Sequence, residues 1–284
     1  MSGDRRAACV IGWPVEQSRS PLIHNYWLKR YGIDGDYRRE AVRPEELGKF
    51  VGSLAARGYV GANVTVPHKE AVLALSEPDE QARAIGAANT LWLGDTLHST
   101  NTDVEGFLAN LDACAPQWDR SLSTAVVLGA GGAARAVIYG LIARGAERIV
   151  VVNRSYGRAR DLRQRFGERV YAARWDERNA TLAGATLLVN ATTLGMQGQP
   201  DLSIEVRRLP DRAIVADLVY VPLLTNLLRA AKARRLRTAD GLGMLLHQAV
   251  RGFALWFGKT PEVTTELRAL VEADLAEQPR HGLQ

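Results

Sequence analysis

The chain has 284 residues, of which 46% are hydrophobic and 24% are charged, a composition that excludes collagen-like and disordered proteins. Its length suggests two domains or one large one. The formal charge is +5, but the basic residues are scattered and form no stripe with interleaved aromatic side chains. We therefore expect no nucleic-acid partner, and attribute the basicity to solvated surface and some affinity for small anions.

The sequence predicts neither a membrane segment nor a metal site. No apolar run approaches the roughly eighteen residues of a membrane-spanning helix, and the apolar stretch 7–12 is too short for a signal peptide, so we expect a cytoplasmic protein. Cys9 and Cys114 cannot build a disulfide framework, and we expect both to be small buried hydrophobes. No cluster of Cys or His has metal-ligand spacing.

The first hundred residues have an α/β pattern. Strands are expected over residues 7–12, 37–41 and 61–66, and helices over 21–31, 45–57, the residues after Pro67 and 77–88. Residues 89–93 can begin a hairpin that turns at Gly94 and Asp95.

The middle of the chain predicts a parallel sheet. Strands are expected over residues 124–128, 148–153, 170–173, 187–190 and 213–217, with helices over 135–145 and 155–166. Strands that alternate with helices favour a right-handed βαβ array with helices on both faces of the sheet. Residues 242–257 and 262–277 are expected to be helical. The fold class is therefore α/β with two lobes.

A glycine-rich turn follows the first strand of this array. Gly129, Gly131 and Ala134 satisfy the dinucleotide fingerprint between a buried strand and a helix. Gly129 permits a tight turn, Gly131 lets the backbone approach a pyrophosphate, and Ala134 keeps the helix close to the strand. The pattern predicts a dinucleotide site, and the alternative is an ordinary tight turn.

The end of the next strand indicates which dinucleotide binds. An NAD site usually has an acidic residue here for the ribose hydroxyl, whereas this chain has Asn153-Arg154-Ser155. Arg154 can bind a 2′-phosphate through two charge-assisted hydrogen bonds, and Arg158 can add a second charge one helical turn later. We predict NADP; alternatively, Arg154 is only a surface residue.

Candidate catalytic side chains lie in the first lobe. Lys69, one of five lysines in the chain, falls just past a buried strand, where a lysine can exchange protons or simply start a helix. Asp103 follows a polar loop and could be only a helix N-cap. Ser18 and Ser20 precede Pro21, where Ser20 is expected as an N-cap or the pair as a carboxylate site.

In order and spacing, these segments resemble the shikimate dehydrogenase family, the NADP-dependent reductases of aromatic amino-acid biosynthesis. The most specific strings are Asn63-Val-Thr-Val-Pro-His-Lys69 and Asp240-Gly-Leu-Gly-Met244. The other matching segments are Gly12-x-Pro14, Ser18-Arg-Ser20-Pro21-x-x-His24-Asn25, Gly86-Ala-Ala-Asn-Thr90, Asn101-Thr-Asp103, Gly129-Ala-Gly-Gly-Ala133, Asn153-Arg154-Ser155, Asn190-Ala-Thr192, Asp217-x-x-Tyr220 and Gln248-Ala249.

The resemblance implies a role for each matched residue. Lys69 and Asp103 correspond to the catalytic pair, and Ser18 and Ser20 to the hydroxyls that hold the substrate carboxylate. The remaining substrate contacts would be Thr65, Asn89, Tyr220 and Gln248. The NADP contacts would be Gly129, Ala130, Gly131, Gly132, Ala133, Asn153, Arg154, Ser155, Arg158, Thr192, Leu218 and Gly241.

The resemblance also implies the domain order and the reaction. Residues 1–103 would form a substrate-binding and catalytic domain, 104–238 a Rossmann-type NADP domain, and 239–284 helices that pack on the first domain. The reaction would be the reversible reduction of 3-dehydroshikimate to shikimate by a monomer or homodimer. The chain departs from the family at Val104, usually Gly, and at Arg19, often Lys; we expect both changes to be tolerated.

Two other functions stay open at this point. One is a paralogue that accepts quinate or uses NAD, which Arg154 and Ser20 disfavour. The other is a non-catalytic NADP sensor, which would need neither Lys69 nor Asp103.

Overall fold

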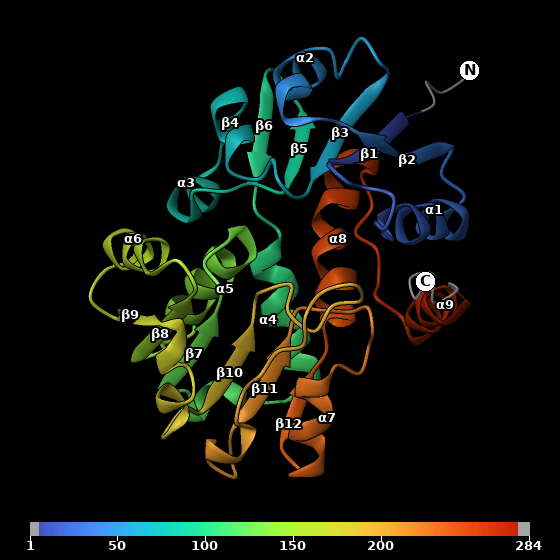
Figure 1. Cartoon of the computed structure of the whole chain (residues 1–284). Helices are drawn as coiled ribbons and strands as arrows, with labels where there is room; N and C mark the ends of the chain where they lie inside the picture. Colours follow the sequence, from blue (N-terminus) through green and yellow to red (C-terminus); the bar gives the residue numbers. More distant parts are fainter. Residues whose placement is uncertain (1–5, 278–284) are drawn as a thin grey trace. The chain divides into compact units, whose positions relative to one another are not determined.

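The structure, a computed structural model, describes residues 6–277, which divide into two compact units (Figure 1). Unit 1 contains the described residues up to Asp103 and the segment Gln248–Asp274. Unit 2 contains Val104–His247 and the described residues from Leu275. Each unit is built on its own sheet, so each has its own core.

Unit 1 has a mixed sheet in the order β2-β1-β3-β5-β6-β4. Its strands are β1 (Arg6–Gly12), β2 (Gly35–Ala41), β3 (Tyr59–Val64), β4 (Glu77–Pro78), β5 (Thr90–Leu93) and β6 (Leu97–Thr100). β1 is parallel to β2 and β3, whereas β5 is antiparallel to β3 and β6. The helices are α1 (Ser20–Tyr31), α2 (Leu47–Gly52) and α3 (Glu80–Ile85), with the later part of α8 (Gly241–Phe257) and most of α9 (Thr265–Glu277).

Side chains from unit 1 strands enter two apolar regions. Cys9, Ile11 and Leu91 pack with α2 in one cluster. An aromatic group that includes His24, Tyr37 and Trp256 joins α1, β2 and α8. Successive side chains of a strand point alternately to these two regions, which is the period-2 pattern of strands with both faces covered.

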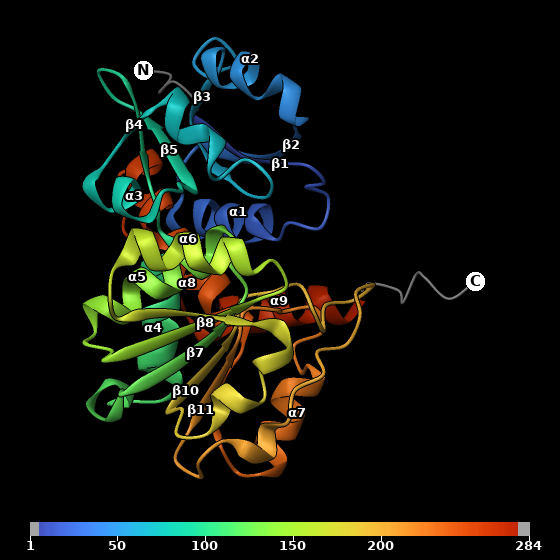
Figure 2. The same cartoon turned by 60° about the vertical axis from the view of Figure 1, so that its left-hand side comes forward.

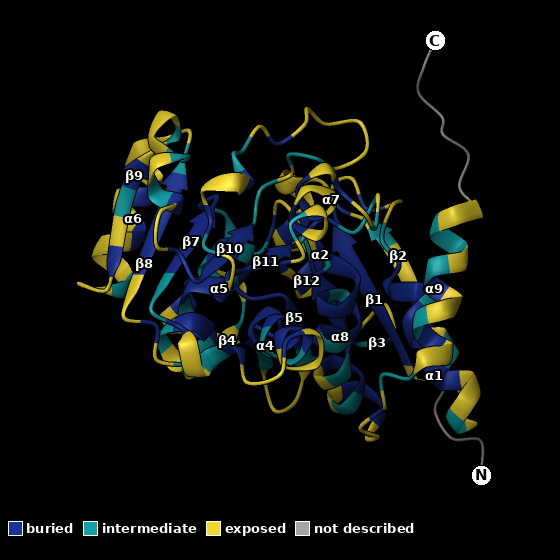
Figure 3. Cartoon of the chain, turned by 90° about the horizontal axis from the view of Figure 1, so that it is seen from below, coloured by how far each residue is buried: buried dark blue, intermediate teal, exposed yellow. Residues whose placement is uncertain are grey.

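Unit 2 has a fully parallel sheet in the order β12-β11-β10-β7-β8-β9 (Figure 2). The strands are β7 (Thr124–Leu128), β8 (Arg148–Asn153), β9 (Val170–Arg174), β10 (Leu187–Asn190), β11 (Ile214–Asp217) and β12 (Arg237–Ala239). Val127 and Val151 pack toward α4 (Asp103–Cys114), α5 (Gly132–Ala143) and α6 (Tyr156–Phe166). Val126 and Val150 pack toward α7 (Asn226–Ala233) on the other face. The central strands of both sheets are largely buried, whereas the edge strands β2, β4, β9 and β12 are partly exposed (Figure 3). The α/β prediction, with a Rossmann-type parallel sheet, is confirmed.

Several local expectations for the first lobe are wrong. Short 3-10 segments at Pro44–Glu46 and Ala71–Leu75 replace parts of two expected helices. α2 ends at Gly52, where the Ser53 hydroxyl donates to the carbonyls of Lys49 and Phe50. The expected helix 77–88 is interrupted, because Glu77 and Pro78 form β4 and pair with β6. α3 starts at Glu80, where the Asp79 carboxylate caps the helix by accepting from the Ala82 N–H. Proline and side-chain caps decide these boundaries.

Two further details differ from expectation. Cys9 is buried in β1 as predicted, but Cys114 is exposed, because it is the last residue of α4 and lies off its buried face. α1 begins at Ser20, so Arg19 rather than Ser20 is the N-cap. Among residues 6–277, no helix is long and apolar enough to cross a bilayer.

Candidate active site

Lys69 and Asp103 form the most direct interaction among the predicted site residues. The Lys69 Nζ donates to Asp103 Oδ2 at 2.5 Å, across 34 residues of sequence. Lys69 follows a turn after β3, where the His68 N–H donates to the Thr65 carbonyl. The Lys69 carbonyl accepts from the Ala88 N–H at 2.8 Å. Backbone contacts therefore fix the lysine before its side chain reaches the carboxylate, and residue 69 does not start a helix.

Asp103 uses its second carboxylate oxygen for Asn89. It is the first residue of α4, and its Oδ1 accepts from Asn89 Nδ2 at 2.9 Å. Its own N–H donates to Asn101 Oδ1 at 3.1 Å. Both carboxylate oxygens are engaged by side chains, so a capping role alone does not describe this residue. The carboxylate is almost fully buried, whereas the Lys69 side chain stays 16% exposed and accessible to a ligand.

Asn89 connects this pair to Gln248 on α8. Asn89 Nδ2 lies 3.4 Å from Gln248 Oε1, and its Oδ1 accepts from the Thr102 N–H at 2.7 Å. Both side chains are buried. Four residues predicted from separate segments, Lys69, Asp103, Asn89 and Gln248, are thus joined by hydrogen bonds within unit 1.

The two serines lie together at the start of α1. Ser18 Oγ is 3.3 Å from Ser20 Oγ and also accepts from the Ser20 N–H. The Arg39 guanidinium donates two hydrogen bonds to the Ser18 carbonyl, which fixes the loop. Two adjacent hydroxyls at a helix N-terminus suit a carboxylate ligand, because the helix dipole and the O–H groups both favour negative charge.

Thr65 lies one residue past β3, half-buried. Its N–H donates to the Ile11 carbonyl at 2.9 Å. A Cβ at Gly12 would clash with the Thr65 methyl, so glycine is required at the end of β1 for Thr65 to occupy this place. Tyr220 belongs to unit 2, where it follows β11 half-buried, and its contact with substrate stays a prediction.

Sequence reasoning missed the environment of Arg19. The residue is 2% exposed, and its Nε lies 2.6 Å from Asp274 Oδ2 on α9. Its Nη1 donates to the Gln17 carbonyl at 2.7 Å. Because its side chain is buried and paired with Asp274, Arg19 is not one of the solvated basic residues. These contacts hold the segment between the two serines. Only a long-range pairing could have shown this, and residue 274 carries no distinctive local signal.

In unit 2, the turn between β7 and α5 is built for close approach by a ligand. Gly129 has φ +109°, and a Cβ there would lie 2.9 Å from the Ala191 carbonyl oxygen. Gly131 is the N-cap of α5, and a Cβ there would meet nothing within 4 Å. Since glycine has no side chain to cap the first turn, its N–H groups are available to an anion. The residues therefore fit the pyrophosphate of a dinucleotide.

The end of β8 carries the predicted phosphate-binding arginine. Asn153 Nδ2 donates to the Ser155 carbonyl at 2.9 Å, which shapes the turn into α6. Arg154, Ser155 and Arg158 are exposed. This side of the site is therefore cationic and accessible, as a 2′-phosphate requires.

Loops after β10 and β11 are held by a buried polar group. Asn190 Nδ2 donates to Asp217 Oδ1 at 2.9 Å, and the Thr192 hydroxyl donates to Asn190 Oδ1 at 2.7 Å. Burial raises the pKa of Asp217. A Cβ at Gly241 would clash with the adjoining Leu218 carbonyl, so that position admits only glycine without a shift. These contacts fix Thr192, Leu218 and Gly241, three predicted cofactor residues.

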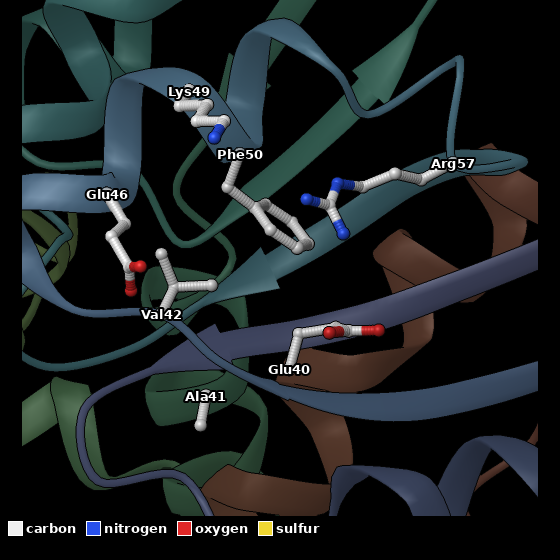
Figure 4. Close-up of a pocket in the computed structure, with 7 residues that line it drawn as sticks. All are labelled: Glu40, Ala41, Val42, Glu46, Lys49, Phe50 and Arg57. Carbon is white, nitrogen blue, oxygen red and sulfur yellow. The ribbon is translucent and has the colours of Figure 1, made fainter.

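A separate hollow of about 190 Å³ in unit 1 contains none of the predicted site residues (Figure 4). Its lining residues are Glu40, Ala41, Val42, Glu46, Lys49, Phe50 and Arg57. The Arg57 guanidinium lies 4.8 Å from the Phe50 ring centroid, and the Tyr59 hydroxyl donates to Glu40. These two charges are thus already paired or stacked. Within the part of the chain that the structure describes, no group of three acidic, His or Cys residues could hold a metal.

Comparisons with known proteins identify the family of the chain. Three family descriptions match: "Shikimate dehydrogenase substrate binding domain" over residues 10–91, "Shikimate / quinate 5-dehydrogenase" over 115–196, and "Shikimate 5'-dehydrogenase C-terminal domain" over 241–270. A shikimate dehydrogenase (NADP(+)) of Rhodopseudomonas palustris strain TIE-1 is 66% identical, covering 97% of this chain and 99% of the relative. One from Afipia carboxidovorans is 65% identical, covering 94% and 97%.

Solved structures are similar along nearly the whole chain. Shikimate 5-dehydrogenase from Thermus thermophilus, in complex with NADP(H) and shikimate, has a TM-score of 0.83 and 36% identity and covers 95% of this chain and 99% of that chain. Quinate dehydrogenase from Corynebacterium glutamicum, in complex with NAD, has a TM-score of 0.88 and 32% identity and covers 95% and 100%. The fold alone therefore does not separate the two substrates.

Proposed function

The chain belongs to the shikimate dehydrogenase family, and on that basis we propose that it catalyses the reversible, NADP-dependent reduction of 3-dehydroshikimate to shikimate. Unit 1 carries the catalytic residues and most of the substrate contacts, and unit 2 binds NADP. The enzyme serves aromatic amino-acid biosynthesis in the cytoplasm, as a monomer or homodimer. The observation that carries the catalytic assignment is the hydrogen bond between Lys69 and Asp103.

Lys69 acts on the reacting oxygen of the substrate. Bound NADPH supplies the hydride, and the carbonyl oxygen of 3-dehydroshikimate gains negative charge as it is reduced. The Lys69 ammonium stabilises this charge and donates the proton that completes the hydroxyl. In the reverse direction, the same nitrogen accepts the proton from shikimate. A positioned general acid contributes roughly 10²–10⁴-fold to the rate, and stabilisation of the developing charge adds to it.

Asp103 and Asn89 hold the lysine and the substrate in register. One carboxylate oxygen of Asp103 accepts from Lys69 and the other from Asn89, so the lysine cannot turn away from the reacting oxygen without breaking these hydrogen bonds. Asp103 also accepts a hydrogen bond from the substrate hydroxyl. Orientation of this kind lowers the entropic part of the barrier.

The remaining contacts bind substrate away from the reacting oxygen. Ser18 and Ser20 donate to its carboxylate, which their place at the N-terminus of α1 supports. Thr65, Asn89, Gln248 and Tyr220 bind its hydroxyls. The polar character of Asn89 and Gln248, both buried, supports this role, because a buried amide needs hydrogen-bond partners.

NADP binds at the ends of the unit 2 strands. The backbone from Gly129 to Ala133 holds the pyrophosphate, Arg154 and Arg158 bind the 2′-phosphate, and Asn153 and Ser155 line the same turn. Thr192, Leu218 and Gly241 form the other wall. The open space at Gly131 and the absence of an acid at residue 154 support this assignment.

The proposal is tested by following absorbance at 340 nm with shikimate or quinate against NADP or NAD. We expect the highest kcat/KM for shikimate with NADP. A preference for quinate or for NAD would favour the alternative paralogue, and no turnover with any combination would favour a non-catalytic NADP-binding protein.

A further inference from the structure

Tyr37 on β2 is a buried tyrosine that packs on α1, the helix at whose start the proposed carboxylate site lies. The residue is 2% exposed, and its hydroxyl donates to Asn63 Oδ1 at 2.5 Å. Burial raises the pKa of the phenol. Tyr37 contacts α1, the helix that begins at Ser20, through the stacked ring of His24.

Asn63 extends the connection toward the catalytic pair. Its Nδ2 donates to the Asn89 carbonyl and to Thr90 Oγ1, each at 3.2 Å. The Thr90 hydroxyl in turn donates to Asn89 Oδ1 at 3.1 Å. Since Asn89 donates to Asp103, buried hydrogen bonds run from the Tyr37 hydroxyl to the carboxylate that holds Lys69.

The Tyr37 ring is fixed on several sides. The His24 ring stacks on it with centroids 4.1 Å apart and planes 8° apart, and Trp256 packs at 5.8 Å. The Asn25 side chain accepts from the Tyr37 N–H and donates to its carbonyl. Burial lowers the pKa of His24 to about 3, so the stacked ring is neutral. Because the ring is packed on these sides, its hydroxyl keeps a fixed position relative to the groups that it contacts.

We propose that Tyr37 and Asn63 are positioning residues that set the spacing between the carboxylate-binding serines and the Asn89–Asp103–Lys69 group. The inference rests on the proposed roles of Ser18, Ser20 and Lys69. The substrate ring is rigid, so its carboxylate and its reacting oxygen are a fixed distance apart. Both ends bind productively only when the two groups of protein residues keep the matching distance.

The test is Tyr37→Phe, which removes one hydroxyl and keeps the ring. Loss of one buried hydrogen bond, with Asn63 left unsatisfied, is expected to lower kcat/KM for shikimate about tenfold. KM for NADP should stay within twofold of wild type. The expected loss should be much smaller for the methyl ester of shikimate, because the serines no longer hold a carboxylate.

Tyr59→Phe is the matched control. Tyr59 is also buried in the unit 1 sheet, and its hydroxyl donates to Glu40 at the hollow of Figure 4. We expect this variant to keep wild-type kcat/KM. Thr90→Val breaks the same connection nearer Asn89 with an isosteric side chain, and it provides the test if Tyr37→Phe does not fold.

Double variants separate positioning from general destabilisation. Tyr37→Phe and Ser20→Ala should be non-additive, because the second change acts on a pair already released. Additive losses, or a Tyr37→Phe variant within twofold of wild type in kcat/KM, would overturn the inference. A wild-type enzyme without activity on shikimate would instead overturn the proposed function.

Discussion

The candidate sites of the two units are built in different ways. In unit 1, charged and amide side chains are joined to one another by hydrogen bonds, as Lys69, Asp103 and Asn89 are. In unit 2, the groups expected to contact the cofactor phosphates are backbone at a glycine turn and exposed arginines. The difference follows from the two functions. Proton transfer needs charged groups that are held accurately relative to the substrate. Selection of NADP over NAD needs only an accessible positive charge near the 2′-phosphate.

The largest effect is expected at Lys69. Lys69→Ala should lower kcat by about two to four decades, because the lysine acts on charge that develops in the transition state. KM for shikimate and for NADP should change little. Steady-state kinetics at saturating substrate measure the loss.

Lys49→Ala is the control for this variant, since Lys49 is an exposed lysine of the same unit at the hollow of Figure 4. It should keep wild-type kcat. If Lys69→Ala kept more than about a tenth of wild-type kcat, the residue would be structural rather than catalytic.

Removing both arginines of the β8 turn should affect selectivity instead of turnover. In Arg154→Ala/Arg158→Ala, the ratio of kcat/KM for NADP to that for NAD should fall by about one to two decades, because charge-assisted contacts to the 2′-phosphate are lost. Activity with NAD should be nearly unchanged. The ratio is compared with that of Arg154→Ala alone at one salt concentration, since salt screens the contact. An unchanged ratio in the double variant would contradict the assignment.

Substitution of the two glycines of the turn should have different effects, one on cofactor binding and the other on stability. Gly131→Ala is expected to fold normally, since a Cβ there meets no protein atom, but to raise KM for NADP and NAD together by about tenfold through contact with the pyrophosphate. Gly129→Ala should instead lose about 1–3 kcal/mol of stability, because its φ is +109° and its Cβ would meet a carbonyl. Steady-state kinetics measure KM for the cofactors, and urea unfolding measures the free energy of unfolding. If the two variants changed KM and the free energy of unfolding equally, the different roles of Gly129 and Gly131 would be contradicted.

The smallest effect concerns stability in unit 1. Burial lowers the pKa of His24 from 6.5 to about 3, so the unfolded chain binds a proton at this residue more readily than the folded one. The free energy of unfolding should therefore fall as the pH decreases through 6.5, by about 1.4 kcal/mol between pH 7.5 and 5.5 from this residue. His24→Phe should lack that part of the loss. Urea unfolding of both proteins at the two pH values tests this, and an identical pH dependence would contradict it.

Local sequence patterns predicted regular elements better than short ones. Five of the six parallel strands of unit 2 were predicted to within one residue, because buried β-branched runs between helices have few alternatives, whereas β12 was not predicted. The two-residue strand β4 depends on its pairing with β6, which lies later in the sequence. Local periodicity contains no information on such pairing.

The site shows the same limit. Motifs identified Lys69 and Asp103, but each alone had an ordinary structural explanation, and the resemblance alone linked them. The Arg19–Asp274 ion pair and the Tyr37–Asn63 hydrogen bond had no local signal, since their partners are far apart in sequence. Chemistry-bearing residues can therefore be found from motifs, whereas the residues that position them require the folded chain.

The central claim is that unit 1 carries the chemistry and unit 2 binds the cofactor. Titration of NADPH, followed by its fluorescence, into Lys69→Ala and Arg154→Ala/Arg158→Ala tests it most directly. We predict that Lys69→Ala binds NADPH with the wild-type Kd while turning over at least about a hundredfold more slowly, and that the arginine variant binds it about ten to a hundred times more weakly. A Lys69→Ala variant that loses NADPH affinity as much as the arginine variant does would contradict the division.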